Sequence, residues 1–443
     1  MPPRTLSRRA ALLLPLAAGG CNTFDDWFGG ARKTPLPGKR YPVLPDKRGL
    51  VVDNPAGRPV TVPDAVANAD LPQPGGNPAH VMGNQAAGDR LATIWSANIG
   101  TGGGYREKLT ARPVSAGGRV YTMDTDGQIT ALDLKTGARI WRVSTQPANL
   151  ESTNIGGGVC LDGGKLYAST GYGEILCLDP AGGKILWRKG LPSAARAAPT
   201  VGDGNVYVPT LDAQLAVYAQ ADGAKQWAYQ STATETTLLG LPSPAYDAGL
   251  LVAGFGAGDL ACLRTTGGAV LWTESLGSIR GGTSLVDLSP IRGLPVIANG
   301  RVYAAGLGGQ VVSVDLRTGR RLWSRDIAAQ EAPLVVGEWV YLVSDEQKLV
   351  AMNAGDGAIA WITQLPHWGD EVKQWDPIRW TGPVMASGRL IVAGSTAQAL
   401  TINPVNGQIV GRQDLKGAVS IPPVVVAGTL LLLHEDGTLQ AMR

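Results

Sequence analysis

The side chains that most often carry acid–base or nucleophilic chemistry are few and widely spaced in this sequence. Its three histidines, His80, His367 and His434, lie in three separate parts of the chain. A general base must lie within hydrogen-bond reach of the group it serves, and we do not expect these histidines to converge. The motifs GxSxG, HExxH and GxxxxGK[ST] are missing from the sequence. The sequence therefore predicts no catalytic residues and no enzyme activity.

Two short motifs have chemical precedents but do not match them fully. Gly254-Phe-Gly-Ala-Gly258 is glycine-rich like a phosphate loop, yet it precedes a predicted strand instead of opening a helix. We interpret it as a turn. Asp124-Thr-Asp-Gly127 could begin a calcium loop, but the glutamate that closes such a loop is missing. We expect neither a metal nor a cofactor.

The cysteines follow the strand pattern and not a metal-ligand spacing. Cys177 and Cys262 occupy a small-residue position that Ala131 fills elsewhere, and Cys160 falls on another predicted strand. Export from the cytoplasm permits disulfides, but these strands are not expected to be neighbours. We predict that the three thiols are buried and free.

The first twenty-one residues have the order of an export signal. Arg4, Arg8 and Arg9 precede the short apolar stretch 10–18, and Ala-Gly-Gly then leads into Cys21. A cysteine in that place resembles a lipobox, which predicts a signal peptide over 1–20 and a diacylated Cys21. Ordinary cleavage near Gly20, with Cys21 incidental, is the alternative. The arginine pair leaves the twin-arginine and the general secretory routes both open.

Charge and composition exclude several classes of protein. With the signal removed, 36 basic residues balance 36 acidic ones, which excludes the basic field of a nucleic-acid binder. No apolar run beyond the signal is long enough to span a bilayer. Residues 21–88 are proline-rich and show no periodic pattern, so they read as a tether or as an arm that lies along the surface.

From residue 89 to residue 443 the chain is a repeat with a period near 45 residues. A clear copy runs from Pro113 through Ala131-Leu-Asp-Leu-Lys-Thr-Gly137 to Trp141. Four short strands per unit at this period predict a β-propeller. The residues that we expect to dock neighbouring blades are Trp95, Trp141, Trp187, Trp227, Trp272, Trp323 and Trp361, while Gly411 stands at the next equivalent position.

Counting the units predicts an all-β protein with eight four-stranded antiparallel blades. The last unit, 423–443, has three strands and stops where its outer strand should begin. A strand without a repeat of its own lies around 91–97 and contains Trp95. We expect it to supply the missing outer strand, so that no sheet edge is left open at the seam.

Three long connections contain aromatic, apolar or charged residues that a turn does not need. The segment 364–380 includes Trp368, Trp375 and Trp380, the segment 275–294 includes Arg280, Asp287 and Arg292, and the segment 230–242 includes three leucines. Apolar and aromatic residues rimmed by charge suggest a protein-binding surface. For the tryptophan segment, a loop that packs down on the ring is an equally good interpretation.

The repeat Ala-Leu-Asp-x-x-Thr-Gly-x-x-x-Trp resembles that of the pyrroloquinoline-quinone-like propellers, which include dehydrogenases and non-enzymatic relatives. With Trp380-Thr-Gly-Pro383 after a charged loop and a cysteine-led N-terminus, residues 90–443 resemble the propeller lipoproteins of the outer-membrane β-barrel assembly machinery. This resemblance implies a scaffold, lipid-anchored to the outer membrane and facing the periplasm. The resemblance further implies that this scaffold binds the POTRA domains of the barrel-forming subunit, BamA, and other subunits of the machinery.

The resemblance also maps the partner contact onto two loops of neighbouring blades. The residues implied are Leu238, Leu239, Leu241, Asp287, Pro290 and Arg292. Leu238 matches an apolar contact of the family. Two acidic family positions fall at Pro290 and Arg292, so the charged part of the contact differs in this chain.

Two other functions fit the repeat. A quinoprotein dehydrogenase shares it, but such enzymes carry an adjacent cysteine pair, and no two cysteines are adjacent here. The other is a propeller adaptor of a different envelope complex, since a fold does not determine its partner.

Overall fold

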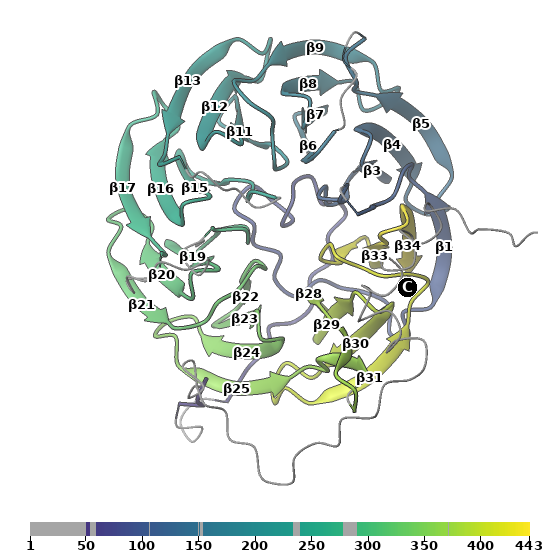
Figure 1. The fold of residues 1–443 in the computed structure, drawn as a ribbon, viewed down its shortest axis with the longest axis vertical. Helices are drawn as coiled ribbons and strands as arrows, with labels where there is room; N and C mark the ends of the chain where they lie inside the picture. Colours follow the sequence, from purple (N-terminus) through teal and green to yellow (C-terminus); the bar gives the residue numbers. More distant parts are fainter. Residues whose placement is uncertain are drawn as a thin grey trace, which may run out of the picture. The chain divides into compact units, whose positions relative to one another are not determined.

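The computed structural model describes residues 50–53, 59–105, 107–148, 150, 154–233, 240–277, 290–370 and 372–443. Within them, eight four-stranded antiparallel sheets stand around a central axis as the blades of a propeller (Figure 1). The eight-bladed fold predicted from the repeat is confirmed. No helix suited to cross a membrane is found in the described residues.

Each blade runs from an innermost strand near the axis to an outer strand on the rim. Blades 1 to 4 consist of β2 (Val114–Ala116), β3 (Arg119–Met123), β4 (Gln128–Asp133), β5 (Arg139–Ser144); β6 (Gly157–Asp162), β7 (Lys165–Thr170), β8 (Glu174–Leu178), β9 (Ile185–Gly190); β10 (Thr200–Gly202), β11 (Asn205–Pro209), β12 (Gln214–Ala219), β13 (Lys225–Gln230); and β14 (Ala245–Asp247), β15 (Leu250–Gly254), β16 (Asp259–Arg264), β17 (Val270–Ser275). Blades 5 to 8 consist of β18 (Val296–Ala298), β19 (Arg301–Ala305), β20 (Val311–Asp315), β21 (Arg321–Arg325); β22 (Leu334–Val336), β23 (Trp339–Val343), β24 (Lys348–Asn353), β25 (Ile359–Gln364); β28 (Trp380–Ala386), β29 (Arg389–Gly394), β30 (Gln398–Ile402), β31 (Ile409–Asp414); and β32 (Val424–Val426), β33 (Thr429–Leu433), β34 (Thr438–Met442) with β1 (Thr93–Asn98). A two-stranded hairpin, β26 (Trp368–Asp370) and β27 (Trp375–Pro377), interrupts the connection between blades 6 and 7.

The ring closes through the strand that precedes the first repeat. β1 pairs antiparallel with β34, with Trp95 opposite Ala441 and Asn98 opposite Thr438. The N-terminal strand therefore completes blade 8, as the repeat count predicts. The closing pair leaves no unpaired strand edge at the seam.

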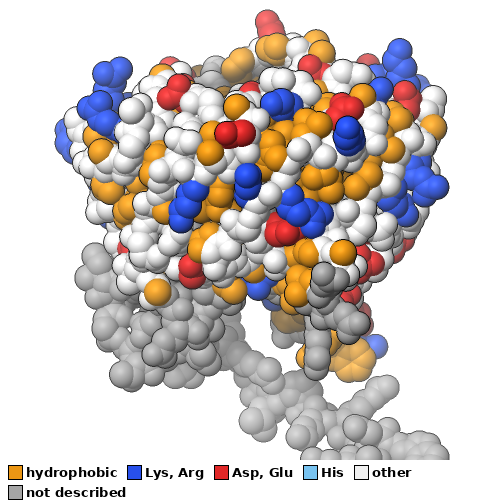
Figure 2. All heavy atoms as spheres, turned by 90° about the horizontal axis from the view of Figure 1, so that it is seen from above, with side chains coloured by type: hydrophobic (Ala, Val, Ile, Leu, Met, Phe, Trp, Pro, Cys, Tyr) orange, Lys and Arg blue, Asp and Glu red, His pale blue; other side chains and the backbone are white. Residues whose placement is uncertain are grey.

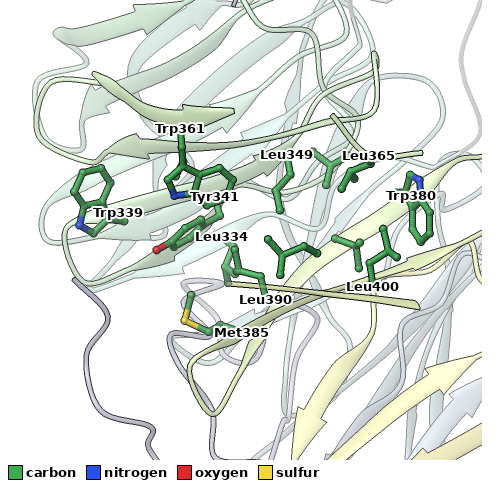
Figure 3. Close-up of a cluster of buried hydrophobic side chains, with 14 of the residues drawn as sticks. Leu334, Trp339, Tyr341, Leu349, Trp361, Leu365, Trp380, Met385, Leu390 and Leu400 are labelled. Carbon is green, nitrogen blue, oxygen red and sulfur yellow. The ribbon is translucent and has the colours of Figure 1, made fainter. Parts of the chain in front are cut away.

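Six of the docking tryptophans, all except Trp187, hydrogen-bond through Nε1 to a carbonyl oxygen of the next blade. The Trp272 Nε1–H of blade 4 donates to the Leu316 carbonyl oxygen of blade 5 at 2.8 Å, and the Trp361 Nε1–H of blade 6 donates to the Pro404 carbonyl oxygen of blade 7 at 3.0 Å. Within each tryptophan's own blade, a tyrosine of the second strand packs against the ring in several blades, as Tyr341 does on Trp361 with centroids 6.0 Å apart. Figure 3 shows this aromatic pair beside the leucines that fill the space between blades 6 and 7.

The seam between blades 7 and 8 has glycine where the other blades have tryptophan. Gly411 lies opposite Thr401, as Trp141 lies opposite Ala131. Blade 8 has no hairpin between its third and outer strands, because β34 pairs with β1 instead. It therefore offers no turn to receive an indole. At this seam Leu91 lies in one buried cluster with apolar side chains of blades 7 and 8. Its carbonyl oxygen accepts a hydrogen bond from Gln413 Nε2 at 3.2 Å.

The rim of the ring is only partly covered by polar side chains. Figure 2 shows it edge-on, with Lys, Arg, Asp and Glu scattered among apolar residues. The exposed apolar residues of the outer strands include Ile140, Leu186, Val270, Ile409 and Val410. Interspersed charges of this kind protect exposed outer strands from pairing with other chains.

The described part of the proline-rich arm crosses one end of the ring (Figure 1) and touches every blade. It hydrogen-bonds to the innermost strands or their turns in seven blades: Asn68 with Val425, Leu71 with Ser115, Pro72 with Leu161, Gln73 with Val201, Pro78 with Tyr246, Ala79 with Ile297 and Gln85 with Met385. Val60 packs against Val336 and Trp339 of the remaining blade. Accordingly, Leu50–Arg443 form one compact unit.

Candidate partner-binding face and central cavity

The connections between blades gather at one end of the ring. In an antiparallel blade the turns alternate between the two ends of the sheet. The turn after each innermost strand therefore lies at the end that the arm covers, where the Gly117 N–H donates to Asp70 Oδ1 at 2.8 Å. We call this end the arm face. The opposite end, which we call the mouth face, holds the connections that lead from one blade to the next, such as 191–199 and 365–379.

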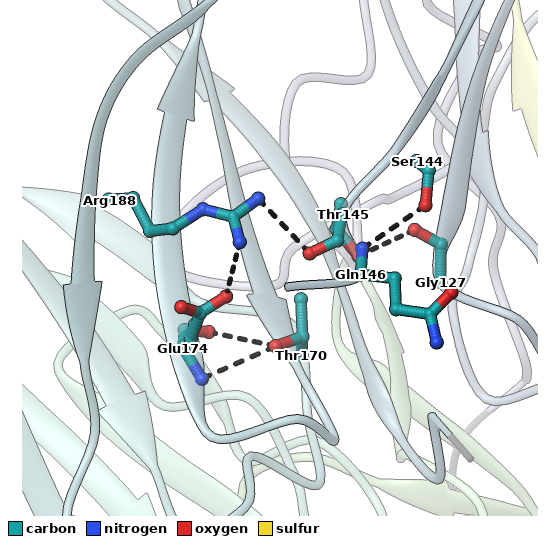
Figure 4. A network of polar contacts seen from close by, with 7 residues as sticks. All are labelled: Gly127, Ser144, Thr145, Gln146, Thr170, Glu174 and Arg188. Atoms are coloured by element: carbon teal, nitrogen blue, oxygen red, sulfur yellow. Dashed lines mark hydrogen bonds and ion pairs between the residues drawn. The ribbon is translucent and has the colours of Figure 1, made fainter. Parts of the chain in front are cut away.

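Polar contacts fix these connections where they leave the blades. Arg188 of β9 contacts Glu174 Oε2 through Nη1 at 3.0 Å and donates through Nη2 to the Thr145 carbonyl oxygen at 3.2 Å. The Thr145 hydroxyl donates to the Gly127 carbonyl oxygen at 2.6 Å. Figure 4 shows this network, which joins blade 2 to the connection that follows blade 1.

A cavity of about 770 Å³ lies at the centre of the ring and is lined mainly by the residues that precede the innermost strands. Pro74 of the arm also lines it. Its charged lining residues are Lys108, Arg112, Arg196, Arg292, Arg379, Glu331, Asp345 and Glu435. We call it the central cavity.

Glu331 is the acid that lies among the arginines. Its Oε1 accepts a hydrogen bond from Thr381 Oγ1 at 2.9 Å, and its Oε2 lies 4.0 Å from Arg112 Nη2. Burial raises the pKa of the Glu331 carboxyl, while Arg112 acts in the opposite direction. Burial also lowers the pKa of the Arg112 guanidinium. At 4.0 Å the pair is too long for a good charge-assisted hydrogen bond, which spans about 2.7–2.9 Å.

The other two inner arginines have still less anionic compensation. Arg292 Nη1 donates to the neutral Gln330 Oε1 at 2.7 Å. Arg196 Nη1 is buried and finds no hydrogen-bond partner among the described residues. Burial lowers the pKa of both guanidinium groups. Glu331 is therefore the carboxylate that acts on both Arg112 and Arg292, while Asp345 and Glu435 are the other acidic residues that line the cavity.

The predicted partner-binding residues lie at the mouth face where they are described. Leu241 is half-buried in the cavity wall, and its N–H donates to the Arg196 carbonyl oxygen at 3.1 Å. Arg292 lines the same wall. Pro290 is buried, and its carbonyl oxygen accepts from Leu307 N–H at 3.1 Å. Leu238, Leu239 and Asp287, like Cys21 and the signal 1–20, lie outside the described residues.

In the tryptophan segment between blades 6 and 7, one part packs down on the ring and another part is exposed, as a protein-binding surface would be. Trp380 is buried and donates to the Pro366 carbonyl oxygen at 2.8 Å, and the Trp368 ring stacks on His367 at 4.8 Å. Trp375, in contrast, is 65% exposed, with Lys373 Nζ 5.3 Å from its ring centroid. The hairpin β26–β27 is thus anchored at its base and presents one aromatic ring to solvent.

The side chains first considered for chemistry serve structural contacts instead. His434 lies 2.8 Å from both the Gly417 carbonyl oxygen and Gln440 Oε1. Asp124 uses Oδ1 to accept from the N–H groups of Asp126 and Gln128. Cys160, Cys177 and Cys262 are free and buried. No cluster of three or more potential metal ligands occurs among the residues that the structure describes.

Sequence analysis did not identify Arg112, Arg196 and Glu331. A signal for them exists, because each lies one to three residues before the proline that opens an innermost strand: Pro113, Pro199 and Pro333. Arg292 has the same place before Pro295. The lead-in to an innermost strand faces the axis of a propeller, so charged residues there are candidates for the channel lining.

Comparison with known proteins gives a consistent family. A family described as outer membrane protein assembly factor BamB matches residues 86–152, 125–363 and 367–443. The BamB protein of Alkalilimnicola ehrlichii is 32% identical over 360 residues, covering 80% of this chain and 90% of its own. The BamB protein of Yersinia pestis is 28% identical over 357 residues, covering 79% of this chain and 88% of its own.

Solved structures agree on the fold. BamB from Moraxella catarrhalis superimposes with a TM-score of 0.67 at 20% identity, over 80% of this chain and 99% of that one. The quinohemoprotein alcohol dehydrogenase of Comamonas testosteroni superimposes with a TM-score of 0.64 at 14% identity, over 85% of this chain and 81% of that one. At these identities the structural likeness concerns the propeller alone.

Proposed function

This chain belongs to the BamB family of outer membrane protein assembly factors, and we propose that it assists the assembly of outer membrane proteins as a non-catalytic scaffold. Family membership carries this proposal, since a family match covers residues 86–363 and 367–443. The protein belongs to the cell envelope. No covalent step or cofactor is part of the proposed role.

The finer part of the proposal concerns the partner. The mouth face binds the POTRA domains of BamA through the loops around Leu241 and Arg292, with Leu238, Leu239 and Asp287 from the same two connections. Support comes from the convergence of these loops. Leu241 and Arg292 are far apart in sequence, yet both line the central cavity, and a Cβ at the neighbouring Gly240 would lie 3.4 Å from Arg292 Nη2. Two connections that meet in this way form one surface.

The proposed attachment completes the arrangement. Cleavage after residue 20 and diacylation of Cys21 tether the ring to the periplasmic side of the outer membrane. The compact unit begins at Leu50, so residues 21–49 are the proposed tether. The segment 59–88 serves as part of the propeller, because it bonds to the innermost strands.

Site-specific cross-linking tests the partner. A photo-reactive amino acid at Leu241 should cross-link, in envelopes of the source organism, to a POTRA-bearing barrel protein identified by mass spectrometry. The matched control is Lys135, an exposed residue in a turn at the arm face, which should not give this product. Cross-linking from Lys135 alone would contradict the docking face. Capture of a different envelope complex from Leu241 would make the protein an adaptor of that complex.

A further inference from the structure

The central cavity has the size of a binding site. Its volume of about 770 Å³ falls in the range of about 300–1,000 Å³ typical of ligand sites. Pro74 of the arm lines the cavity and is itself held in place, because the adjacent Gln73 makes two hydrogen bonds to Val201.

Basic residues outnumber acidic ones in the lining of the cavity, which favours an anion: the bases are Lys108, Arg112, Arg196, Arg292 and Arg379, and the acids are Glu331, Asp345 and Glu435. Arg112, Arg196 and Arg292 come from connections that lead into three different blades, yet all line this one space. The Glu331 carboxylate lies 4.0 Å from Arg112 Nη2, and within the described residues it forms no ion pair with Arg196 or Arg292. Arginines arranged around a common space suit planar carboxylates, which accept two N–H bonds from one guanidinium.

The environment of Arg196 is a second observation that favours an anion, independent of the charges that line the cavity. Its Nη1 is buried without a partner among the described residues, although buried polar atoms are nearly always hydrogen-bonded. The Nη1 group in that state is a donor that has already lost its water, although the Arg196 side chain as a whole is half-buried. An incoming carboxylate would satisfy it without first displacing another protein group.

The position of the cavity indicates that the carboxylate belongs to a protein. The wall that carries Arg196 and Arg292 also carries the apolar Leu241 and Leu294, and Leu241 lies at the proposed docking loops. We propose that the central cavity receives an aspartate- or glutamate-bearing segment of a partner protein, with Arg196 and Arg292 binding its carboxylates. This inference rests on the proposed function in one respect: it assumes that the partner docks on the mouth face.

Peptide binding by the purified protein tests the inference without the assembly machinery. The mature protein, extracted in mild detergent, is titrated into a fluorescein-labelled peptide of glutamate and leucine residues, and anisotropy is measured. The same peptide with glutamine in place of glutamate is the ligand control. We expect the glutamate peptide alone to bind, and Arg196→Gln and Arg292→Gln each to weaken binding about tenfold or more. Glu331→Gln should strengthen it severalfold, because it removes the competing carboxylate.

A matched surface variant separates a cavity site from general charge. Arg264→Gln removes the same charge from an exposed position at the end of β16 and should leave binding unchanged. Equal losses in Arg196→Gln and Arg264→Gln, or absence of binding by the unsubstituted protein, would overturn the proposal. So would a free polycarboxylate such as citrate that binds at the cavity while the peptide does not. A cross-link from Leu241 without peptide binding would leave the proposed function standing and remove only this inference.

Discussion

Gly319 lies directly against the indole of Trp272, so that a Cβ added to the glycine would come within 2.5 Å of the ring's Cγ. Gly319 also has φ +72°, which side chains rarely adopt. The same contact recurs around the ring, for example between Gly137 and Trp95 and between Gly223 and Trp187. The repeat thus encodes a pair in which the turn of one blade receives the tryptophan of the previous blade.

Replacing this glycine tests the pair. Gly319→Ala should lower the free energy of unfolding by about 1 kcal/mol for the backbone conformation and by a further ~1–3 kcal/mol for the forced displacement of the indole. Gly300→Ala is the matched control, because Gly300 has the same φ of +72° with nothing within 4 Å of the added Cβ. Urea unfolding measures the loss of unfolding free energy in each of the two variants. Equal losses in the two variants would show that the indole contact is unimportant.

The hydrogen bond of the docking tryptophan can be tested in a similar way. Trp272 Nε1 donates to the Leu316 carbonyl oxygen at 2.8 Å, whereas Trp187 Nε1 is buried without a partner in the described structure. Trp272→Phe should therefore cost about 1–2 kcal/mol more than Trp187→Phe, because only the former removes an N–H donor from a buried carbonyl, to which the Cys262 thiol at 3.8 Å is only a weak donor. Thermal unfolding of the two variants compares them directly. A larger loss in Trp187→Phe would contradict this assignment.

Much of the ring could be predicted from the sequence because its determinants are local and repeated. The turn residues from Asp133 to Gly137 form the same hydrogen bonds as those from Asp315 to Gly319, since each aspartate Oδ1 accepts from the threonine N–H and hydroxyl three residues later. The final unit has three strands and the strand before the first repeat has no partner, so pairing these two parts to close the ring is the expected solution. Even the exception at Gly411 follows from this closure, because blade 8 lacks the turn that would receive an indole.

The cavity and the arm could not be predicted in this way because their determinants are long-range. Arg112, Arg196 and Glu331 belong to lead-in segments that differ from blade to blade, and only the circular arrangement brings them together. The arm bonds to strands that follow it by as many as 357 residues, as Asn68 does to Val425. Proline content predicts an extended segment, but not which strands it contacts.

His80 predicts a specific loss of stability in acid. It is buried in the arm, its Nδ1 lies 2.7 Å from the Pro295 carbonyl oxygen, and its Nε2 has no partner among the described residues. Burial is the main cause that lowers the pKa of His80 from 6.5 to about 4, and Arg112 contributes. Between pH 6.5 and pH 4, His80 therefore binds a proton in the unfolded chain but stays neutral in the folded chain. Stability should fall by up to about 3 kcal/mol as the pH drops from 6.5 to 4.

The substitution His80→Asn isolates this effect. An asparagine amide can still donate to the Pro295 carbonyl oxygen but does not titrate. The variant should thus lose less stability than the unsubstituted protein between pH 7 and pH 4.5, as measured by urea unfolding at both pH values. Parallel losses would show that other groups cause the acid sensitivity.

The docking face predicts a variant that separates binding from folding. Leu241 is half-buried at the mouth of the cavity, so Leu241→Asp should leave the melting temperature nearly unchanged while it reduces capture of the POTRA-bearing partner about tenfold. Leu238→Asp should act in the same direction. The measurement is affinity capture from envelopes with quantitative mass spectrometry. Unchanged capture by a normally folded variant would exclude this loop from the contact.

Gln73 predicts how strongly the arm holds the ring. The side-chain amide of Gln73 is buried, donating through Nε2 to the Val201 carbonyl oxygen at 2.9 Å and accepting at Oε1 from the Val201 N–H at 3.1 Å. Gln73→Glu keeps the shape but places a carboxylate oxygen against that carbonyl oxygen, which should cost about 1–3 kcal/mol at pH 7. Gln226→Glu, at an exposed position of β13, is the control and should cost nearly nothing.

The pH dependence of this variant distinguishes the lost donor from a general disturbance of the arm. A protonated carboxyl regains an O–H donor for the Val201 carbonyl oxygen, so folding favours protonation and raises the pKa of the introduced carboxyl above its unfolded value. The cost of Gln73→Glu relative to the unsubstituted protein should therefore shrink as the pH falls from 7 to 5 and grow as it rises. A cost that stays constant across this range would mean that the hydrogen bonds between Gln73 and Val201 do not hold the arm in place.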